Sequence, residues 1–455
     1  MKRITMFVFV LLLSLLVACG RDNDETYVEE ICNISEEMPH YAPEYPPDYI
    51  PDYIPEPWQP SLDDVFSSGR TRAEYLYDLD FFYTTLLENF PLFGAIYRRH
   101  GADLHTRYAN ARTRVETREN ITDEIFMSIL HDITAGARNI GHLSILFEDA
   151  AARYFVQAYS HLIAQGALEM QPFLDEFNNP ATRAFYNLTD EDFIPPAEGV
   201  ESAVYASVSN NIQTRIIEEN RIAYVNILSM NFATMEIDRV TLLDFFHLVA
   251  DYDHLIVDIR QNPGGTGMFF RELVISPNIS YPLYFSNYMF FMGGEHNRRL
   301  LASWFGFEDG GIRPIDHNVI AHMPYFRQDN IYMFNYFRHQ SIHIEPSYDI
   351  GIFTGKIWLL VDPRTFSAAE LATAVTKQTG FATIVGHRTG GGGLGMTPLV
   401  LALPNTGVVL RYAAGYGVDE YGRENYEHGT QPHYFNRPGL DALGTVLAMI
   451  REGSY

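Results

Sequence analysis

A serine that opens a helix is the first residue whose position suits covalent chemistry. Between Lys356 and Glu370 an apolar strand runs into a tight connection, and Ser367 begins the helix that follows. Two small residues, Ala368 and Ala369, come next, so a substrate could approach closely and the amide of Ala368 could face an oxyanion. A second interpretation stays open, because Ser-x-x-Glu is also a capping box in which Ser367 only caps the helix.

A second apolar strand ends in a turn that could bind an anion. It begins at Leu255 and finishes in Asn-Pro-Gly-Gly, where Gly264 and Gly265 permit positive φ and close approach of the backbone. Two amides at such a strand end could stabilise a developing oxyanion. Taken alone, the segment is better interpreted as a turn.

His142 is the candidate general base. It lies in the short segment Asn-Ile-Gly-His-Leu-Ser that ends at Ser144. An imidazole takes a proton from a serine hydroxyl near neutral pH, and a histidine base predicts activity that rises through a pKa near ~6.5 if that pKa is unperturbed. The alternative is an ordinary solvated loop histidine.

Metal and cofactor sites are not predicted. None of the sixteen histidines belongs to a His-Glu-x-x-His motif, and His339 and His343 have the spacing without the glutamate. Gly390, Gly392 and Gly395 satisfy G-x-G-x-x-G, but a strand rather than a helix follows them, so a dinucleotide site is not expected.

The amino terminus reads as an export signal. Residues 1–18 have a basic start and a short apolar run, and Ala18 precedes Cys19. The segment resembles the lipobox of bacterial lipoproteins, which implies a lipid on Cys19 that binds the membrane without spanning it and places the protein at the bacterial cell envelope. An ordinary secretory signal with an incidental cysteine is the alternative. Residues 19–66 are acidic and rich in proline and tyrosine, which predicts an extended linker.

Composition limits the remaining functions. The chain carries 57 acidic against 32 basic residues, a formal charge of −25, which argues against nucleic acid as a partner. Two cysteines cannot build a disulfide scaffold. With 47% apolar residues and 455 in total, the chain can form two or three domains of about 150 residues.

Apolar periodicity predicts a helical part followed by an α/β part. Helices are expected over 73–90 and 102–118, from Thr122, and over 151–176. Further on, short apolar runs predict strands at 222–228, 254–259, 356–362, 382–386, 399–403 and 408–412. Helices are expected between them at 239–250, 367–379 and 439–451. Nearly continuous apolar strands alternating with helices indicate a sheet covered on both faces. The aromatic-rich segment 280–350 gives no clear assignment.

Together these segments resemble the tail-specific, or C-terminal processing, serine peptidases. Asp-x-Arg-x-Asn-x-Gly-Gly matches Asp258 to Gly265, and Thr-x-Ser-Ala-x-Glu matches Thr365 to Glu370. Val-Gly-x-x-Thr-x-Gly matches Val385 to Gly391, and a late Glu-x-x-Gly-x-x-Pro pattern is assigned to Glu427 to Pro432. Four matches in the family's order are more specific than any one of them.

The resemblance implies an α/β fold of the crotonase or Clp-protease type, with layered sheets and helices. It implies the signal and linker already described, a helical module over 67–205 that carries the base, and a catalytic domain over 206–455. Family members often carry a PDZ domain, but no convincing carboxylate-binding loop of that type is found between His142 and Ile222.

Lysine usage favours one branch of the family. Members with a Ser–Lys dyad carry the lysine 25 positions after the serine, and here that position is Gly392. The chain has only three lysines: Lys2, Lys356 and Lys377. The branch resembling the tricorn protease core and the interphotoreceptor retinoid-binding protein modules also lacks the dyad lysine.

By resemblance to that branch, Ser367 is the nucleophile, His142 the base, and Glu427 the residue that orients or charge-stabilises the histidine. Ala368 and the turn of Gly264 and Gly265 would supply oxyanion amides. The expected function is a membrane-tethered serine endopeptidase acting on protein or peptide substrates. The alternative is an inactive protein of the same fold that binds a peptide or an apolar ligand.

Overall fold

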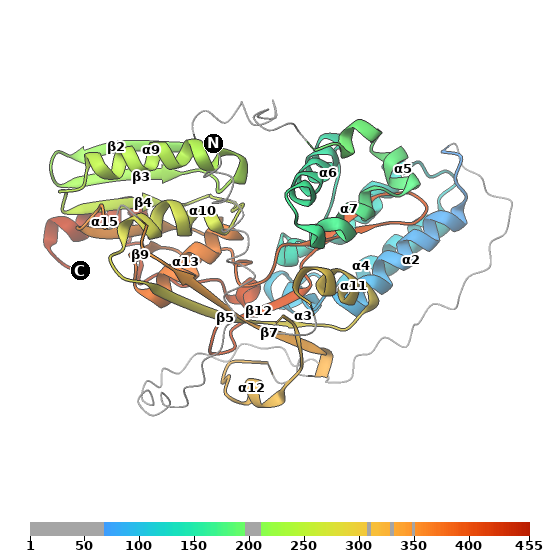
Figure 1. Cartoon of the computed structure of the whole chain (residues 1–455). Coiled ribbons are helices and arrows are strands. Elements are labelled where there is room, and N and C mark those ends of the chain that lie inside the picture. The colour runs from blue at the N-terminus through green and yellow to red at the C-terminus, as the bar shows by residue number, and fades with distance from the viewer. Residues whose placement is uncertain (1–67, 196–210, 307–310, 328–331, 348–350) are drawn as a thin grey trace.

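The computed structural model describes residues 68–195, 211–306, 311–327, 332–347 and 351–455. The predicted signal segment, Cys19 and the acidic linker lie outside the described residues. The helices of residues 72–177 gather on the right of Figure 1, and the six-stranded sheet lies on the left with helices of its own. The long strands β5 (Leu283–Phe291) and β7 (Tyr336–Ile344) lie between the two groups.

Helices occur in both parts of the chain. The first part contains α2 (Arg72–Asn89), α3 (Phe93–His100), α4 (Leu104–Thr117), α5 (Asp123–Thr134), α6 (Asp149–Ala164), α7 (Gln171–Phe177) and α8 (Pro180–Phe185). The second part contains α9 (Met235–Leu248), α10 (Met268–Phe270), α11 (Glu295–Phe305), α12 (His317–Ala321), α13 (Ala368–Thr379), α14 (Asn425–His428) and α15 (Ala442–Glu452).

The strands form three sheets. The largest has the order β13 (Tyr434–Phe435), β9 (Thr383–Gly386), β8 (Lys356–Val361), β4 (His254–Asp258), β3 (Ile222–Ile227) and β2 (Ile212–Glu218). A four-stranded sheet has the order β12 (Gly415–Val418), β5 (Leu283–Phe291), β7 (Tyr336–Ile344) and β6 (Arg313–Pro314). A three-stranded sheet has the order β1 (Ser144–Ile145), β11 (Val409–Tyr412) and β10 (Leu399–Ala402).

The six-stranded sheet is covered on both faces, as the sequence predicts. Its strands from β3 to β13 pair in parallel, and β2 closes one edge in the antiparallel sense. Side chains alternate between the faces: Val257 and Leu359 pack with residues of α9 and α13, whereas Ile256 and Leu360 pack with residues of α15. This layered α/β arrangement confirms the expected fold class.

The aromatic-rich segment 280–350, which gave no clear assignment from the sequence, contains two long antiparallel strands. Strands β5 and β7 pair over nine residues each, from Leu283 opposite Ile344 to Phe291 opposite Tyr336. One face is buried through residues such as Phe290 and Phe337. Aromatic side chains at alternate positions therefore form part of the core, and the pattern is that of a half-buried strand.

One predicted helix is two. The sequence predicts a helix over 151–176, but α6 ends at Ala164 and α7 begins at Gln171. Gly166 lies between them with φ of 100°, a conformation that interrupts a right-handed helix. The predicted N-cap at Thr122 is confirmed, since the Thr122 side chain accepts a hydrogen bond from the Ile125 amide at the start of α5.

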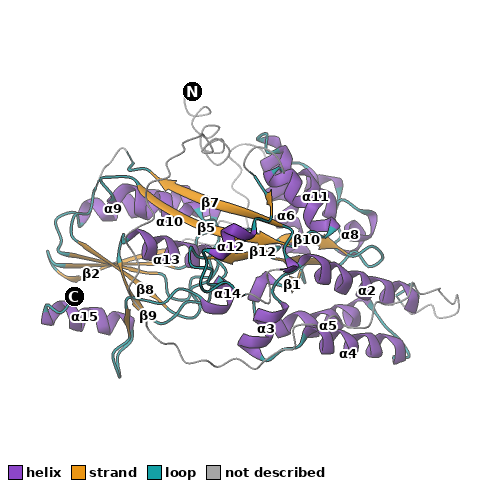
Figure 2. Cartoon of the chain, turned by 90° about the horizontal axis from the view of Figure 1, so that it is seen from below, coloured by secondary structure: helices purple, strands orange, loops and turns teal. Residues whose placement is uncertain are grey.

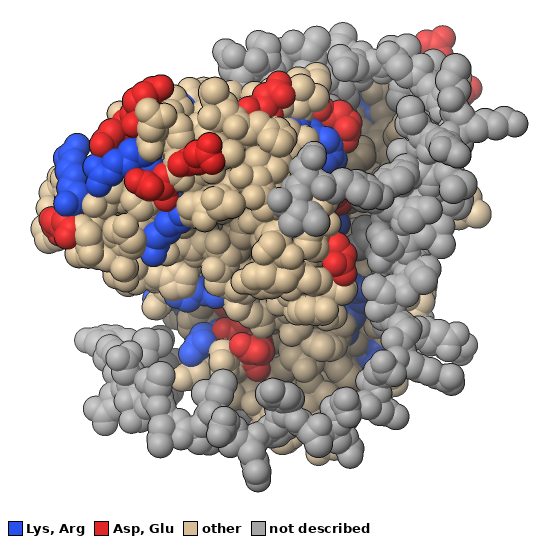
Figure 3. Space-filling model, turned by 60° about the vertical axis from the view of Figure 1, so that its left-hand side comes forward, with Lys and Arg blue, Asp and Glu red and all other residues tan. Residues whose placement is uncertain are grey.

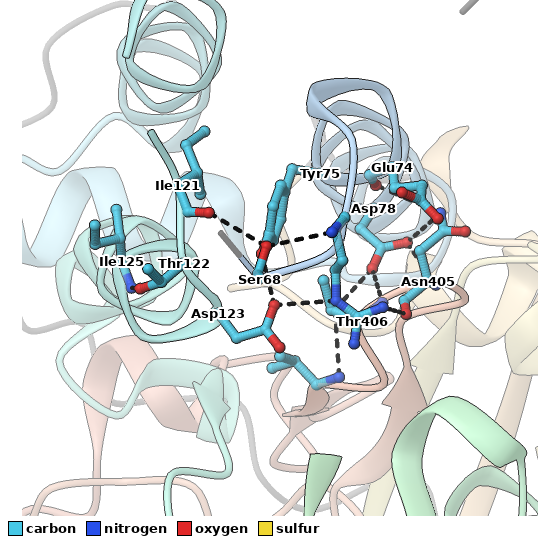
Figure 4. Close-up of polar contacts among 12 residues, drawn as sticks. Ser68, Glu74, Tyr75, Asp78, Ile121, Thr122, Asp123, Ile125, Asn405 and Thr406 are labelled. Atoms are coloured by element: carbon cyan, nitrogen blue, oxygen red, sulfur yellow. Dashed lines mark hydrogen bonds and ion pairs between the residues drawn. The ribbon is translucent and has the colours of Figure 1, made fainter. Parts of the chain in front are cut away.

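A buried carboxylate ties the helical part to the small sheet. Asp78 of α2 is fully buried and accepts hydrogen bonds from the backbone amides and side chains of Asn405 and Thr406, in the loop that joins β10 to β11 (Figure 4). On the same helix, the Tyr75 hydroxyl donates to Asp123 of α5 at 2.6 Å. Figure 2 shows β1 and β10 beside these helices. The helical part is thus fixed to the strand hairpin that pairs with β1.

The surface carries charges of both signs. On the face that Figure 3 shows, acidic and basic side chains lie among larger areas of uncharged residues. Exposed pairs such as Arg221 with Glu218 contribute little to stability in water. Within the described ranges, no helix combines the length and the apolar character needed to cross a membrane.

Candidate active site

Ser367 lies at a sharp turn between β8 and α13. Its φ of 56° and ψ of −120° fall in a region that non-glycine residues rarely adopt, at a cost of about 1–3 kcal/mol. The backbone holds this geometry from both sides: the Ser367 amide donates to the Gly391 carbonyl at 3.1 Å, and the Leu371 amide donates to the Ser367 carbonyl at 2.9 Å. The turn directs the hydroxyl away from the helix that it opens.

The capping-box interpretation of Ser367 is wrong. The serine side chain makes no capping hydrogen bond to the first turn of α13. Glu370, the other half of the motif, is buried and accepts hydrogen bonds from the side chains of Asn425 and Thr430, each at 2.6 Å. Burial raises the pKa of Glu370 to about 7. The glutamate therefore anchors α14 rather than closing a cap.

His142 lies beside the serine hydroxyl. Its Nε2 is 3.1 Å from Ser367 Oγ, a hydrogen-bonding distance. The histidine follows Gly141, whose φ is 64°, and a Cβ at Gly141 would collide with the Phe90 ring. The imidazole also packs on the Phe366 ring, with centroids 4.8 Å apart. Residues 225 positions apart in sequence thus come within hydrogen-bonding distance, an arrangement in which an imidazole could accept the proton of a serine hydroxyl.

The imidazole is held neutral. Burial is the largest cause, and the positive charge of Arg411 adds to it; together they lower the pKa of His142 to about 3. An unprotonated ring is the form that can accept the serine proton. The value near 6.5 that the sequence suggests for an unperturbed histidine does not apply in this environment.

The other ring nitrogen contacts a tyrosine. His142 Nδ1 lies 2.6 Å from the Tyr426 hydroxyl, and the rings meet edge to face with centroids 5.8 Å apart. Burial raises the pKa of Tyr426 well above its ordinary value, so the phenol stays protonated. When Nδ1–H donates to the phenol oxygen, Nε2 is left as the acceptor that faces Ser367.

Glu427, the predicted orienting residue, is directed elsewhere. Its two carboxylate oxygens accept hydrogen bonds from Arg98 of α3, at 2.8 Å from Nε and 2.7 Å from Nη2. This bidentate pair is mostly buried and binds α14 to the helical part. The structure therefore does not bring Glu427 to the histidine ring.

The motif register explains the difference. In Glu-x-x-Gly-x-x-Pro the glutamate stands three positions before the glycine and six before the proline. Counting back from Gly429 and Pro432 gives Tyr426, not Glu427. Sequence reasoning missed Tyr426 because the assignment was shifted by one residue, and the phenol occupies the position where the pattern has a carboxylate.

The predicted oxyanion amides differ in their availability. Ala368 is the first residue of α13, and the first amides of a helix have no partner within it. The Gly264 amide is already used, since it donates to the Asn262 side chain at 2.9 Å. Gly265 forms a parallel bridge with Met230. The Met230 amide donates to the Gly264 carbonyl, and the Met230 carbonyl accepts from the Thr266 amide. The Gly265 amide therefore points away from Met230. Ala368 and Gly265 remain as candidates, and Gly264 does not.

The glycine loop leaves no room for a dyad lysine. Gly392 has φ of 82°, and a Cβ there would lie 2.7 Å from the Tyr426 ring and 2.8 Å from the Phe366 ring. Lys356 begins β8 and packs against Trp358 and Tyr455, at the end of the strand away from Ser367. No cluster of three or more metal-binding side chains occurs in the part of the chain that the structure describes.

Comparison with known proteins gives one family match. Residues 317–435, which include Ser367 and Tyr426, match the model of peptidase family S41. No curated protein matches the chain.

The solved structures that match this chain have low sequence identity to it. Mature CPAF complexed with lactacystin is 15% identical, with a TM-score of 0.49 over 84% of this chain and 98% of that one. A protein from Parabacteroides merdae assigned as a peptidase is 16% identical, with a TM-score of 0.47 over 84% and 95%. The photosystem II D1 C-terminal processing protease is 11% identical, with a TM-score of 0.38 over 84% and 98%.

The similarity to family S41 covers the part of the chain that contains Ser367. That segment carries the serine turn, the glycine loop and α14, which supplies the partner of the histidine ring. These features make residues 317–435 similar to peptidase family S41.

Proposed function

We propose that the protein is a serine endopeptidase in which Ser367 is the nucleophile and His142 the general base. The observation that carries this proposal is the 3.1 Å approach of His142 Nε2 to Ser367 Oγ, with the serine held at positive φ. A serine hydroxyl is a weak nucleophile until a base accepts its proton, and the neutral imidazole is in place to do so.

The reaction follows from this geometry. Ser367 Oγ attacks the scissile carbonyl carbon while its proton passes to His142 Nε2. The amides of Ala368 and Gly265 stabilise the tetrahedral oxyanion, a contribution of about 3–4 kcal/mol. The imidazolium then gives its proton to the leaving amine, and the acyl-enzyme forms. Water attacks the ester in a second half-reaction that uses the same base.

Tyr426 takes the orienting position in this mechanism. A carboxylate at Nδ1 fixes the tautomer because it can only accept a hydrogen bond, and it also offsets the imidazolium charge. A neutral phenol accepts from Nδ1–H but supplies no negative charge. Tyr426 is therefore a positioning residue, and the base that it orients is weaker than one paired with a carboxylate.

Active-site labelling tests the proposal. A fluorophosphonate probe is expected to modify the wild-type protein at Ser367, because the probe reacts with serines that a neighbouring base activates. The Ser367→Ala protein should show no labelling, and peptide mapping of the wild type should place the adduct on the tryptic peptide containing Ser367. A folded wild type that neither labels nor cleaves a peptide library would be a binding protein on a peptidase fold.

We also propose that the protein is exported and held at a bacterial membrane by a lipid on Cys19. The proposal is supported by the basic start, the apolar run and the small residue before Cys19. Metabolic labelling with a palmitate analogue in a bacterial host should tag the wild type and place it in the membrane fraction. Cys19→Ala should lose both the tag and the membrane association. Equal labelling of the Cys19→Ala protein would overturn lipidation at this residue.

A further inference from the structure

Two adjacent arginines in the last turn of α3 reach from the helical part toward the active site. These residues are Arg98 and Arg99. Helix α3 packs against α14, which lies beside it in Figure 2. It also packs against the short turn Ala135–Ala137, which leads into the segment of His142. The helix therefore contacts α14, which carries Tyr426, and the turn that precedes the candidate base.

Arg99 donates hydrogen bonds to backbone carbonyls of two active-site segments. Its Nη1 lies 3.0 Å from the carbonyl oxygen of Gly390 in the glycine loop, and the same nitrogen donates to the carbonyl of Tyr426. Tyr426 is the residue whose hydroxyl contacts the ring of His142. One side chain of the helical part therefore joins the glycine loop to the orienting tyrosine.

The glycine loop in turn holds the serine turn. The Gly390 amide donates to the Thr365 carbonyl at 2.9 Å, and the Ser367 amide donates to the Gly391 carbonyl at 3.1 Å. Between these two bonds, Phe366 and Gly391 form a parallel bridge. A non-glycine residue at positive φ persists only where surrounding contacts hold it, so Ser367 depends on this bridge. A displacement of the glycine loop would therefore displace the nucleophile.

Arg99 also lies near the carboxylates that fix α14. The buried carboxylate of Glu424 accepts hydrogen bonds from the amides of Tyr426 and Glu427, at 2.9 and 2.6 Å. Burial raises the pKa of Glu424 to about 8 and that of Glu370 to about 7. The positive charge of Arg99 interacts with Glu370, Glu424 and Glu427. A cation here offsets part of the cost of burying carboxylates, so the charge of the residue matters as well as its donors.

We propose that Arg99 is a positioning residue that keeps Ser367 and Tyr426 in register with His142. This inference rests on the proposed peptidase function and adds a residue to its machinery. Arg99 binds backbone carbonyls of the protein itself, so it acts through the glycine loop and through Tyr426. The nucleophile, the base and the phenol come from three segments far apart in sequence. A misplacement of about 1 Å among such groups can lower the rate about 100-fold.

Replacing Arg99 tests the proposal by kinetics. Arg99→Met keeps the apolar stem but removes the donors and the charge, and it should lower kcat about 100-fold while KM stays within about threefold. Arg99→Lys keeps the charge, but an ammonium group does not replace a planar guanidinium, so kcat should fall about tenfold. Each variant is assayed well below its Tm. If Arg99→Met does not fold, the result for Arg99→Lys decides.

Two comparisons separate positioning from stability. Arg112→Met breaks the 3.2 Å ion pair with Asp80 inside the helical part, and it should lower the Tm but leave kcat within about twofold. Adding Tyr426→Phe to Arg99→Met should lower kcat by no more than about a further threefold, because Arg99 acts partly through Tyr426. A kcat of Arg99→Lys within about threefold of the wild type, or losses that add fully in the double variant, would overturn the proposal.

A spectroscopic signature keeps this proposal apart from the peptidase proposal. The hydrogen bond between His142 Nδ1 and the Tyr426 hydroxyl should give a downfield proton resonance that Tyr426→Phe shifts or removes. Arg99→Lys should shift the same resonance, and Arg112→Met should not. A wild type that neither labels nor cleaves, with a resonance that Arg99→Lys shifts, would overturn the peptidase and support the positioning role. An active wild type whose resonance Arg99→Lys leaves unchanged would leave the peptidase standing and overturn the role of Arg99.

Discussion

Alanine in place of Ser367 or of His142 is expected to lower kcat/KM by about 10⁴-fold or more, and alanine at both positions to lower it no further. The two side chains act as one unit, because the hydroxyl is nucleophilic only while Nε2 accepts its proton. Once either is removed, the other has no function left to lose. Single and double variants assayed on one peptide measure this non-additivity directly.

Matched variants keep this result interpretable. His247→Ala changes an exposed histidine of α9 and should leave kcat/KM within about twofold. Lys377→Met removes the lysine that follows the serine on α13 and should be equally mild if no Ser–Lys dyad operates. If the decreases in log kcat/KM of the Ser367→Ala and His142→Ala proteins added up in the double variant, the two residues would act in different steps. A His142→Ala enzyme within tenfold of the wild type would exclude histidine as the base.

Local sequence patterns were sufficient for the elements that present the nucleophile. Strand β8 and helix α13 are close to their predicted ranges because a continuous apolar run and a helical stripe determine them with little help from tertiary contacts. The orientation of Ser367 was not predictable in the same way. A capping serine and a nucleophile have the same local sequence, and they differ in a positive φ and in a histidine 225 residues away.

Two residues, Tyr426 and Arg411, could not be identified from their residue type alone. Tyr426 is neither acidic nor basic near neutral pH, so a search for a triad member passes over it in favour of the adjacent Glu427. The spacing of three positions before Gly429 would have identified Tyr426. Arg411 lies on β11, and its charge acts on His142 only because segments far apart in the sequence come together in the fold. Pairing between distant strands is a tertiary property that periodicity does not determine.

The pH dependence of the wild type is expected to lack an inflection near pH 6.5. The base must be unprotonated in the free enzyme, so kcat/KM falls only as the pH drops through the pKa of His142. Burial and Arg411 lower that pKa to about 3, which places the acid limb below pH 5 and leaves activity constant from there through neutrality. A midpoint between pH 6 and 7 in the wild type would show that the imidazole is solvated.

Replacing Tyr426 should separate orientation from charge. Tyr426→Phe removes the acceptor for Nδ1–H and is expected to lower the plateau of kcat/KM about 10- to 100-fold, the loss of about 1.5–3 kcal/mol, without moving the acid limb. Tyr426→Glu places a carboxylate near the imidazole, which favours the imidazolium and should move the limb upward by about one to three pH units. Tyr421→Phe, an exposed tyrosine close to α14 in sequence, serves as the control and should change neither quantity. The proposed role of Tyr426 would be contradicted if Tyr426→Phe left the plateau of kcat/KM unchanged and Tyr426→Glu did not move the acid limb of the pH profile. The phenol would then only fill space, and another group would have to orient the histidine.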